Sequence, residues 1–503
     1  MAKPGSLLSI LIILASLAPC LFGQSLPTHT SLWLDACGVD DIRQSEPHVI
    51  AKLQDWGALP DTTQYILITR FDFPDDLHLK CKPKRVGLNC SNAVAALRMM
   101  SKDSSFDSVS TLFVETDTLS ESLVDAISSL PSITHLTLSF GLHGAKASFA
   151  KMVRLPSLTY LSLLWTGSDQ LTMTGFSALE KLKVLSVLGI GSCSEQTFKD
   201  ICSSNSISAL DVSGLRLPGD YSLLLQRMSH LTILSLPGAT DGGQALDFPY
   251  SSLQSLRSIK APSLDLKDVQ NLDSLEELVV YRTLSSSMHG GAVRLPGLRY
   301  LDVSMCNFSG VTIDAFAKCN KLEYLSISGS RGVDGDSLTT LLSATPHIVE
   351  IDISHTDLGS SVEAWLPEKV AAKLLVLRMA FCRKVKEACL TYIACAAKAL
   401  QVFVLQGVAE LTVAALRKVS MLRQLLVLDV SGQASLSDDI LKQYAENLMC
   451  LQQLSIMSSP LVTDEGVEAL LAIKSLQQIT LEGCTQVGDS IRRKLSDSGV
   501  VVD

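Results

Sequence analysis

The sequence predicts an α/β solenoid, in which short parallel strands stack along one side and helical segments return along the other. Two observations lead to this prediction. The first is composition: the 503 residues are 47% hydrophobic but only 5% aromatic. Such an aliphatic chain is too apolar for disorder and too long for one ordinary core, which favours several domains or a repeat array. The second is a recurring apolar-x-x-apolar-x-apolar pattern, which indicates repeats.

The pattern recurs at nearly constant spacing. It begins sixteen times, and its starts are almost evenly spaced except that Leu275 follows Leu256 after a distinctly shorter interval. Chance placement of leucine would not give this regularity, and one large mixed α/β domain does not explain it. The starts are Val109, Ile133, Leu158, Leu182, Ile207, Leu231, Leu256, Leu275, Leu298, Leu322, Ile348, Leu374, Leu400, Leu425, Leu451 and Leu476.

Each copy begins with an expected strand. In residues 155–165, Leu161 and Leu163 take the alternate positions that a strand turns inward, while Tyr160 and Ser162 point outward. One strand and one helix cannot bury such faces alone. Neighbouring copies therefore stack into a continuous apolar column.

Each copy continues into an expected helix. In the copy after Leu451, Thr463 and Asp464 are N-cap candidates. Val467 and Leu470 follow at the spacing of an inward helical stripe. The alternation of strand and helix within a single copy is what predicts the α/β class.

Over about residues 109 to 499 the chain resembles the leucine-rich repeat family. The resemblance implies a curved horseshoe with a parallel β-sheet on its concave face and helical segments on its convex face. The later copies have periods near 26 and include LVTDEGVEAL at 461–470. They are similar to the cysteine-containing subtype that is frequent in the substrate-recognition halves of F-box ubiquitin-ligase adaptors.

The family places Asn or Cys eight residues after the first apolar residue, where the side chain hydrogen-bonds the backbone of neighbouring turns. We call these places the eighth-position column. It contains no Asn here, which departs from the common extracellular pattern. Its polar and cysteine members are Cys306, Cys382, Cys484, Thr166, Thr283, Thr356, Ser330 and Ser459, and its departures are Gly141, Ile190, Leu215, Ala239, Leu264, Val408 and Gln433.

The thirteen cysteines indicate two environments. We expect the three cysteines of the eighth-position column to be buried free thiols that pack as small hydrophobes. Cys81 and Cys90 flank a polar segment before the repeats. They are candidates for a disulfide that caps the open end of the solenoid, with Cys37 as the competing partner.

The first segment has the layout of a secretory signal peptide. Lys3 precedes the apolar run 7–17, and a looser stretch ends at the small residue Gly23. A membrane anchor is the alternative. It is disfavoured because about 20 apolar residues are needed to span a bilayer and Pro19 interrupts this run. We therefore expect residues 1–23 to be a leader and the mature chain to have no stable membrane span.

The rest of the chain divides by its repeats. Residues 24–105 lack the pattern and are rich in Pro and Trp, which predicts a globular N-terminal cap. Residues 106–503 contain the sixteen copies and are expected to form the solenoid. The short interval between Leu256 and Leu275 leaves little room for a helix, and either a seam near 240–275 or a simple insertion or deletion would explain it.

Composition and motifs argue against several functions. The 42 basic and 51 acidic side chains give a formal charge of −9 without a long basic run, so no nucleic-acid partner is expected. No phosphate-binding, zinc-protease or serine-hydrolase motif is present, and the nine His are scattered. Cys382, Cys389 and Cys395 lack a C-x-x-C pair and a nearby His, so neither a metal site nor a cofactor is expected. We expect a non-catalytic protein.

The outward strand positions predict a binding face. Tyr281, Tyr300 and Tyr324 come from three consecutive copies. Since Tyr300 and Tyr324 are equivalent and neighbouring strands lie about 4.8 Å apart, their rings should stand side by side. Acidic residues predominate at these positions, so we expect a protein or peptide partner with basic residues. The alternative is that the Tyr rings cover Leu edges and the acids are solvated. The other candidate contacts are Asp302, Glu350, Asp352 and Arg378.

Two functional classes follow. The first is a secreted or endomembrane recognition protein that binds a protein or peptide on its concave face; the second is an intracellular F-box type adaptor. The expected leader favours the first and a location outside the cell or in the lumen of the secretory pathway. Asn89 and Asn307, in Asn-Cys-Ser and Asn-Phe-Ser, would then be glycosylation acceptors. Asn307 directly follows Cys306 and is expected to be the more tightly packed.

Overall fold

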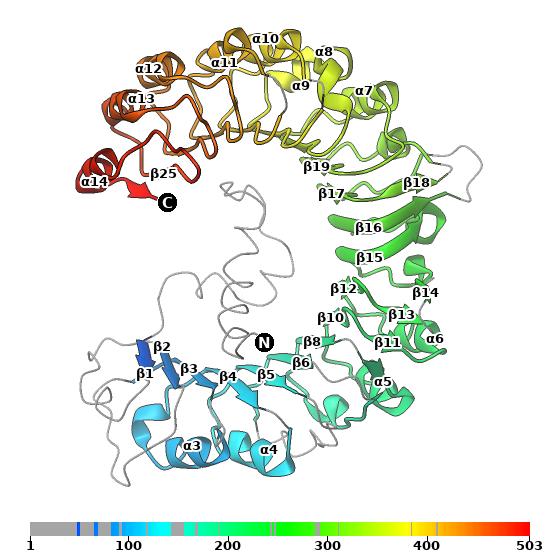
Figure 1. The fold of residues 1–503 in the computed structure, drawn as a ribbon. Helices are drawn as coiled ribbons and strands as arrows, with labels where there is room; N and C mark the ends of the chain where they lie inside the picture. The colour runs from blue at the N-terminus through cyan, green and yellow to red at the C-terminus, as the bar shows by residue number, and fades with distance from the viewer. Residues whose placement is uncertain are drawn as a thin grey trace. The chain divides into compact units, whose positions relative to one another are not determined.

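The chain forms two compact units, Met1–Pro262 (unit 1) and Ser263–Asp503 (unit 2), in the computed structural model drawn in Figure 1. The leader expected at 1–23, Cys37, and the pair Cys81 and Cys90 lie outside the residues that the structure describes. These are 48–50, 65–68, 82–89, 93–116, 119–141, 155–165, 170–189, 191–241, 244–245, 248–286, 292–309, 311–383, 385–408 and 411–503.

Unit 1 is built on a parallel sheet whose strands follow one another in chain order, with helical segments on one side (Figure 1). The strands are β1 (His48–Ile50), β2 (Tyr65–Ile68), β3 (Arg85–Asn89), β4 (Thr111–Thr116), β5 (His135–Phe140), β6 (Tyr160–Trp165), β8 (Val184–Gly189), β10 (Ala209–Asp211), β12 (Ile233–Ser235) and β15 (Ser258–Asp265), which begins in unit 1. The helical segments are α3 (Ala93–Met100), η3 (Ser104–Phe106), α4 (Glu121–Ser128), η5 (Phe176–Ala178), α5 (Glu195–Cys202), α6 (Tyr221–Leu225) and η6 (Tyr250–Ser252).

The parallel sheet begins N-terminal to residue 106, where the sequence pattern placed the start of the solenoid. Strand β3 pairs in parallel with β4, and α3 follows it as a helical segment follows later strands. The pattern missed this copy because Pro83 takes its first buried position, one repeat before Val109. The region expected as a cap at 24–105 therefore contains strands of the same sheet.

A second, small sheet in unit 1 lies at the turns that follow the main strands. Its members are β7 (Gln170–Leu171), β9 (Ser192–Cys193), β11 (Arg216–Leu217), β13 (Thr240–Asp241) and β14 (Gln244–Ala245), all parallel except β14.

In the short interval between Leu256 and Leu275, the 3-10 helix η7 (Leu266–Val269) takes the place of a longer helix.

Unit 2 repeats the same plan with longer helices. Its parallel strands line one side and its helices the other (Figure 1). The strands are β16 (Glu277–Ser285), β17 (Tyr300–Asp302), β18 (Asn307–Ser309), β19 (Tyr324–Ser326), β20 (Glu350–Asp352), β21 (Val376–Arg378), β22 (Val402–Val404), β23 (Val427–Asp429), β24 (Gln453–Ser455), β25 (Gln478–Thr480) and β26 (Val501–Val502). The helices are η8 (Ile313–Phe316), α7 (Gly335–Ala344), η9 (Leu358–Ser361), α8 (Val362–Trp365), α9 (Glu368–Ala371), α10 (Glu387–Ala396), α11 (Val413–Val419), α12 (Asp438–Asn447), α13 (Asp464–Ala469), η10 (Leu470–Ala472) and α14 (Asp489–Asp497).

The core of unit 2 is the column of inward strand residues that the repeat pattern predicts. Leu301, Leu325, Ile351 and Leu377 pair in register on successive strands, and each is fully buried. Each of these side chains therefore packs against equivalent residues of the neighbouring repeats. This stacking is the reason that one repeat cannot be stable by itself.

Helix starts in unit 2 are bound to the preceding repeat by an aspartate. Asp438, the first residue of α12, accepts hydrogen bonds from the Thr463 amide at 2.9 Å and the Thr463 hydroxyl at 2.6 Å. Thr463 in turn is the N-cap of α13, as its sequence predicts. Gly466 follows and is buried directly against Asp438. The Thr-Asp-x-Gly stretch thus fixes one helix against the one before it.

Gly466→Ala is expected to lower thermal stability. A Cβ there would lie 2.8 Å from the Asp438 Cα and would also clash with its carboxylate. Overpacking of this kind costs about 1 to 3 kcal/mol, against a gain of up to ~1 kcal/mol from helix propensity. Gly335→Ala in α7 is the control, because its Cβ would make only an ordinary 3.6 Å contact with Trp365. Thermal unfolding that ranks Gly466→Ala above Gly335→Ala in stability would contradict this packing.

Candidate functional site

Two tyrosines stack on the side of the unit 2 strands opposite the helices, which we call the sheet face. Tyr300 and Tyr324 pair in register on β17 and β19. Their ring centroids lie 4.0 Å apart with planes inclined by 5°, so the expected side-by-side arrangement is confirmed. Both rings are partly buried. Burial raises the pKa of both phenols well above the ordinary value, so both stay neutral and act as amphipathic surface.

An ion pair lies beside this stack. Glu350 is the in-register neighbour of Tyr324, and its Oε1 lies 2.5 Å from Arg378 Nη1. Only 6% of the Glu350 side chain and 11% of the Arg378 side chain are exposed. Burial lowers the pKa of Arg378, but Glu350, Tyr324 and Asp352 together raise it on balance, so the guanidinium stays charged. Glu350 is therefore not a free acidic contact for a partner.

Each of four aspartates at strand ends accepts a hydrogen bond from the backbone amide two residues later, which stabilises the turn after the strand. Asp302 Oδ1 accepts from the Ser304 amide at 2.9 Å, and Asp352 Oδ1 accepts from the Ser354 amide at 2.8 Å. Asp429 makes the same bond to Ser431 at 2.9 Å, and Asp211 makes it to Ser213 at 3.0 Å in unit 1. The sheet face does contain the predicted acidic residues, but these carboxylates also accept hydrogen bonds that stabilise the turns.

The serines of these turns extend the link to the next repeat. Ser354 Oγ accepts from the Ala380 amide at 3.1 Å, and Ser431 Oγ accepts from the Met457 amide at 3.1 Å. The sequence signal for this arrangement is Asp-Val-Ser or Asp-Ile-Ser at 211–213, 302–304, 352–354 and 429–431. The periodicity of the strands does not reveal this bond, because the bond forms after the strand has ended.

Tyr281 does not join the tyrosine stack. Tyr300 pairs with Glu277 at the start of β16, so Tyr281 lies four residues farther along that strand. Its side chain is 38% exposed. The candidate residues that the structure brings together are thus the Tyr300–Tyr324 stack, the Glu350–Arg378 pair and, on the same face, Asp302 and Asp352.

The cysteines of the eighth-position column form the hydrogen bonds that the family resemblance implies. Cys306, Cys382 and Cys484 are buried, as expected, and each Sγ lies 3.1 Å from a carbonyl of an earlier repeat. The acceptors are the carbonyls of Val280, Ile353 and Ile456. Burial, with a smaller effect of Asp302, raises the pKa of Cys306 to about 12, which keeps it a thiol at neutral pH.

The three cysteines of the eighth-position column are expected to resist thiol reagents until the protein unfolds, because their sulfurs are buried and the reagent cannot reach them. Cys395 and Cys450 are exposed and serve as internal controls that should react at once. Timed labelling with a maleimide, read by peptide mass spectrometry, distinguishes the two groups. Labelling of Cys306, Cys382 and Cys484 as fast as the controls in native protein would show that the register is wrong.

The structure corrects the expectation for Asn307. It lies in β18 with an exposed side chain, although Cys306 beside it is buried. The reason is the alternation of the strand, which turns successive side chains to opposite faces. Asn89 ends β3, and its side chain lies outside the described part.

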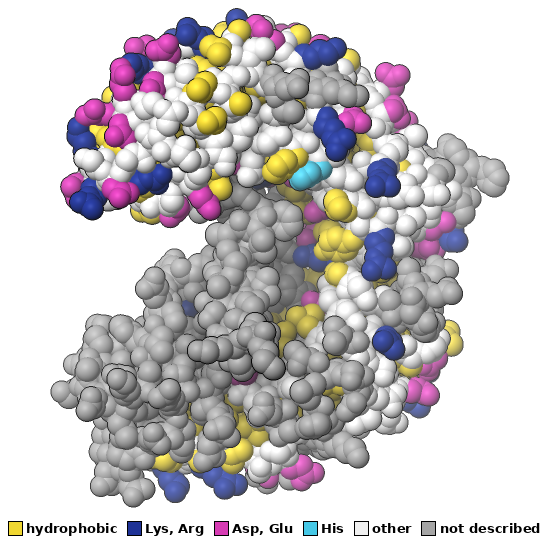
Figure 2. Space-filling view, viewed as in Figure 1, with side chains coloured by type: hydrophobic (Ala, Val, Ile, Leu, Met, Phe, Trp, Pro, Cys, Tyr) yellow, Lys and Arg dark blue, Asp and Glu magenta, His cyan; other side chains and the backbone are white. Residues whose placement is uncertain are grey.

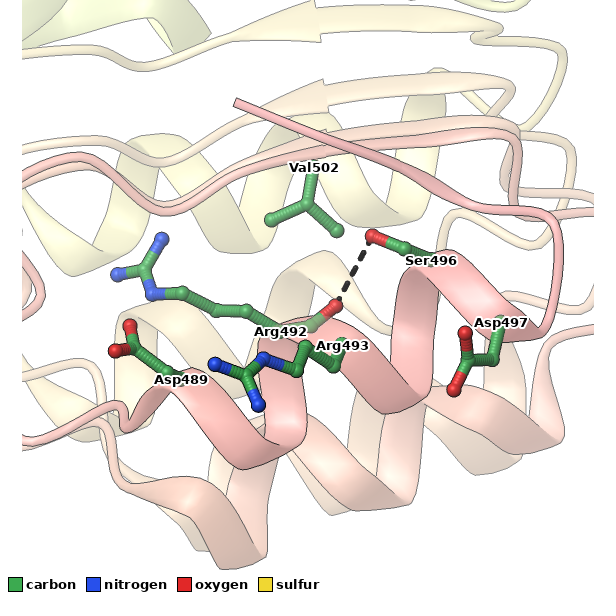
Figure 3. Close-up of a pocket in the computed structure, with 6 residues that line it drawn as sticks. All are labelled: Asp489, Arg492, Arg493, Ser496, Asp497 and Val502. Atoms are coloured by element: carbon green, nitrogen blue, oxygen red, sulfur yellow. Dashed lines mark hydrogen bonds between the residues drawn. The ribbon is translucent and has the colours of Figure 1, made fainter.

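The helix side near the carboxyl end carries side chains of both signs (Figure 2). One hollow there lies between α14 and β26 and is lined by Asp489, Arg492, Arg493, Ser496, Asp497 and Val502 (Figure 3). Arg492 Nη2 donates to the Leu481 carbonyl at 3.1 Å, and Ser496 donates to the Arg492 carbonyl at the same distance. These bonds stabilise the end of the chain and do not form a catalytic arrangement.

Metal ligands and membrane-spanning helices are two further features that the described residues could contain. Within the described residues, no three His, Cys, Asp or Glu side chains come together in a way that could hold a metal ion. Cys382 and Cys389 are buried, whereas Cys395 is exposed. No helix in the described ranges is long and apolar enough to cross a bilayer.

Comparisons with known proteins gave one family match and several similar solved structures. The family model for the Leucine Rich Repeat matches residues 297–319, which contain β17 and β18. Among solved structures, the chain is similar to an internalin (inlF) from Listeria monocytogenes, with 17% identity over 74% of this chain and 87% of that chain and a TM-score of 0.39. It is also similar to the mouse RP105/MD-1 complex, with 16% identity, coverage of 78% and 86%, and a TM-score of 0.42. For the TLR13–ssRNA13 complex these values are 13%, 83%, 63% and 0.38. No curated protein matches the chain.

Proposed function

We propose that this chain, a leucine-rich repeat protein, is a non-catalytic binding protein whose sheet face in unit 2 holds a segment of a partner protein. The observation that carries the proposal is the Tyr300–Tyr324 stack. It places two aromatic edges and two neutral hydroxyls on the open side of a sheet, which is the chemistry enriched in protein interfaces. The exposed sheet of a repeat array is a binding surface in many such proteins.

The partner segment should carry Lys or Arg beside an apolar anchor. The anchor would contact the tyrosine rings, and the basic group would lie near Asp302 and Asp352, which are partly exposed on the same face. Glu350 contributes less, because Arg378 already neutralises it. Charge should govern the rate of encounter more than the final affinity, so added salt should slow association.

The test begins with the full chain as bait for partners. Replacing Tyr300 and Tyr324 together by Ala should weaken binding of the captured partner by about 2 kcal/mol or more, the loss that marks a hot spot. The fold should persist, because both side chains lie outside the leucine column. Val413→Ala in α11 is the control, since Val413 is an exposed apolar residue on the helix side. Unchanged binding of the double variant, with loss on Val413→Ala, would move the site to the helices.

We also propose that the chain enters the secretory pathway and loses its leader near Gly23. The support is the amino-terminal sequence, with Lys3 before an apolar run. The expected result is a mature amino terminus near residue 24 on secreted or lumenal protein, with glycan at Asn89, at Asn307 or at both. Cell fractionation with amino-terminal sequencing and glycopeptide mass spectrometry measures these. An intact Met1 on cytosolic protein would contradict the proposal and favour the F-box type adaptor.

A further inference from the structure

One residue in most repeats of unit 2 has a left-handed backbone, in the turn that follows the strand. Glycine fills this place at Gly329, Gly407, Gly432 and Gly483, with φ between 62° and 75°. Three large side chains fill it elsewhere: Met305 with φ 58°, His355 with φ 59° and Phe381 with φ 54°. All these residues have the same role in the backbone. Except at Gly483, the amide of the residue at this place donates a hydrogen bond to a carbonyl of the next repeat.

The three large residues adopt a left-handed backbone at a place where glycine would be less strained. L-residues with a side chain are disfavoured in the left-handed region, whereas glycine is not. Burial does not compensate, because Met305 is 70% exposed, Phe381 is 45% exposed and His355 is also exposed. Strained, exposed residues of this kind are concentrated at functional sites.

The three side chains form an apolar ledge along the turns. Met305 lies over Gly329, where any added Cβ would clash with its sulfur. The His355 ring stacks on Phe381 with centroids 4.8 Å apart and planes inclined by 17°, and Phe381 in turn lies over Gly407. Met305 and Phe381 therefore pack directly on the backbone of Gly329 and Gly407. We call Met305, His355 and Phe381 the turn ledge.

Basic side chains border the turn ledge. Arg282 lies opposite the turn that contains Met305, because Val279 pairs with Asp302 and Thr283 pairs with Asn307. The Arg331 amide bonds the Cys306 carbonyl next to Met305, and Arg383 follows Phe381 by two residues.

The charge at this border is mainly positive. The side chains of Arg282, Arg331 and Arg383 are exposed, and none of them forms an ion pair with the described residues. Asp357, which follows His355 by two residues, is the acidic residue closest to the ledge in the sequence. Figure 2 shows hydrophobic side chains next to a histidine, with Lys or Arg and also Asp or Glu side chains nearby. The border can therefore attract acidic groups.

We propose that the turn ledge is a second binding surface, separate from the tyrosine stack, that docks an acidic protein segment. An apolar side chain of the segment would lie on Met305 and Phe381, and its Asp or Glu residues would pair with Arg282, Arg331 and Arg383. The charge of this surface is opposite to that of the aspartates on the sheet face, so the two surfaces select different partners.

The test selects phage-displayed random peptides on the full chain. We expect enriched peptides with Asp or Glu beside Leu, Phe or Trp. Replacing both Met305 and Phe381 by Gly should weaken their binding at least about tenfold, which is ~1.4 kcal/mol. Because glycine relieves the left-handed strain, the melting temperature of this variant should not fall. Ser458→Gly, at the same turn place with φ 53° but away from the ledge, is the matched control and should bind like the wild type.

Several results would overturn the proposal. Enrichment of basic peptides, no enrichment, or equal binding by the Met305→Gly/Phe381→Gly variant would each contradict it. A fall in melting temperature of that variant would show that the side chains stabilise the fold. A further contrary result is displacement of the peptides by heparin, with their binding weakened by Arg331→Gln/Arg383→Gln but not by Met305→Gly/Phe381→Gly. That result would show that the surface binds polyanions in general and that the apolar side chains have no role.

Discussion

Leu377→Ala is expected to lower the free energy of unfolding by about 2 to 5 kcal/mol, the cost of truncating a fully buried aliphatic side chain. Leu377 is the inward residue of β21 and pairs in register with Ile351 and Phe403, both of which are buried. The cavity would therefore open between three repeats at once. Urea unfolding of the full chain measures the effect.

Cys382→Ser is the comparison variant in the same repeat. The hydroxyl can still donate to the Ile353 carbonyl that Cys382 Sγ now reaches, so the change should cost less than Leu377→Ala. The two variants separate the contribution of the leucine column from that of the eighth-position column. If Cys382→Ser destabilised the protein as much as Leu377→Ala, the hydrogen-bonded column would be as important to stability as the aliphatic core.

Glu350→Ala is expected to cost about 3 to 5 kcal/mol of unfolding free energy, because it leaves the buried Arg378 guanidinium without its partner. Replacing both residues, as in Glu350→Leu with Arg378→Met, should restore most of that loss, since no unpaired charge remains. Chemical denaturation of Glu350→Leu, of Arg378→Met and of the double variant measures the coupling between the two residues. Additive losses in the double variant would show that the pair contributes nothing as a pair.

This ion pair also decides how binding experiments are designed. A variant of Glu350 or Arg378 that lost its partner would lose stability as well, so its binding could not be interpreted. Tyr300 and Tyr324 avoid this difficulty, because they lie outside the buried column and stack on each other.

The periodic part of the fold could be predicted from the sequence. Alternate apolar residues along each strand, repeated at a nearly constant interval, determine which side chains face inward, so Leu301, Leu325 and Leu377 were identifiable. The Tyr300–Tyr324 stack followed from the same arithmetic, since equivalent positions on adjacent parallel strands are neighbours. The copy at β3 was missed because Pro83 replaced the expected leucine.

The rest could not be predicted because it depends on turns. Whether an aspartate is solvated or bonds the amide two residues on is decided by the conformation after the strand, as at Asp302 and Asp352. The left-handed backbone of Phe381 is equally invisible in a pattern of apolar residues. Nor does strand periodicity tell that Arg378 turns toward Glu350. Of the acidic contacts predicted from the strands, Glu350 is therefore the one that an ion pair within the chain neutralises.

The most direct test of partner binding by the sheet face is site-specific photocrosslinking. Benzoylphenylalanine would replace Tyr324 on the sheet face in one protein and Val413 on the helix side in another, with the captured partner present in both. The proposed function predicts a crosslink to the partner from position 324 and none from position 413. A crosslink from position 413 alone would contradict it and place the partner on the helices.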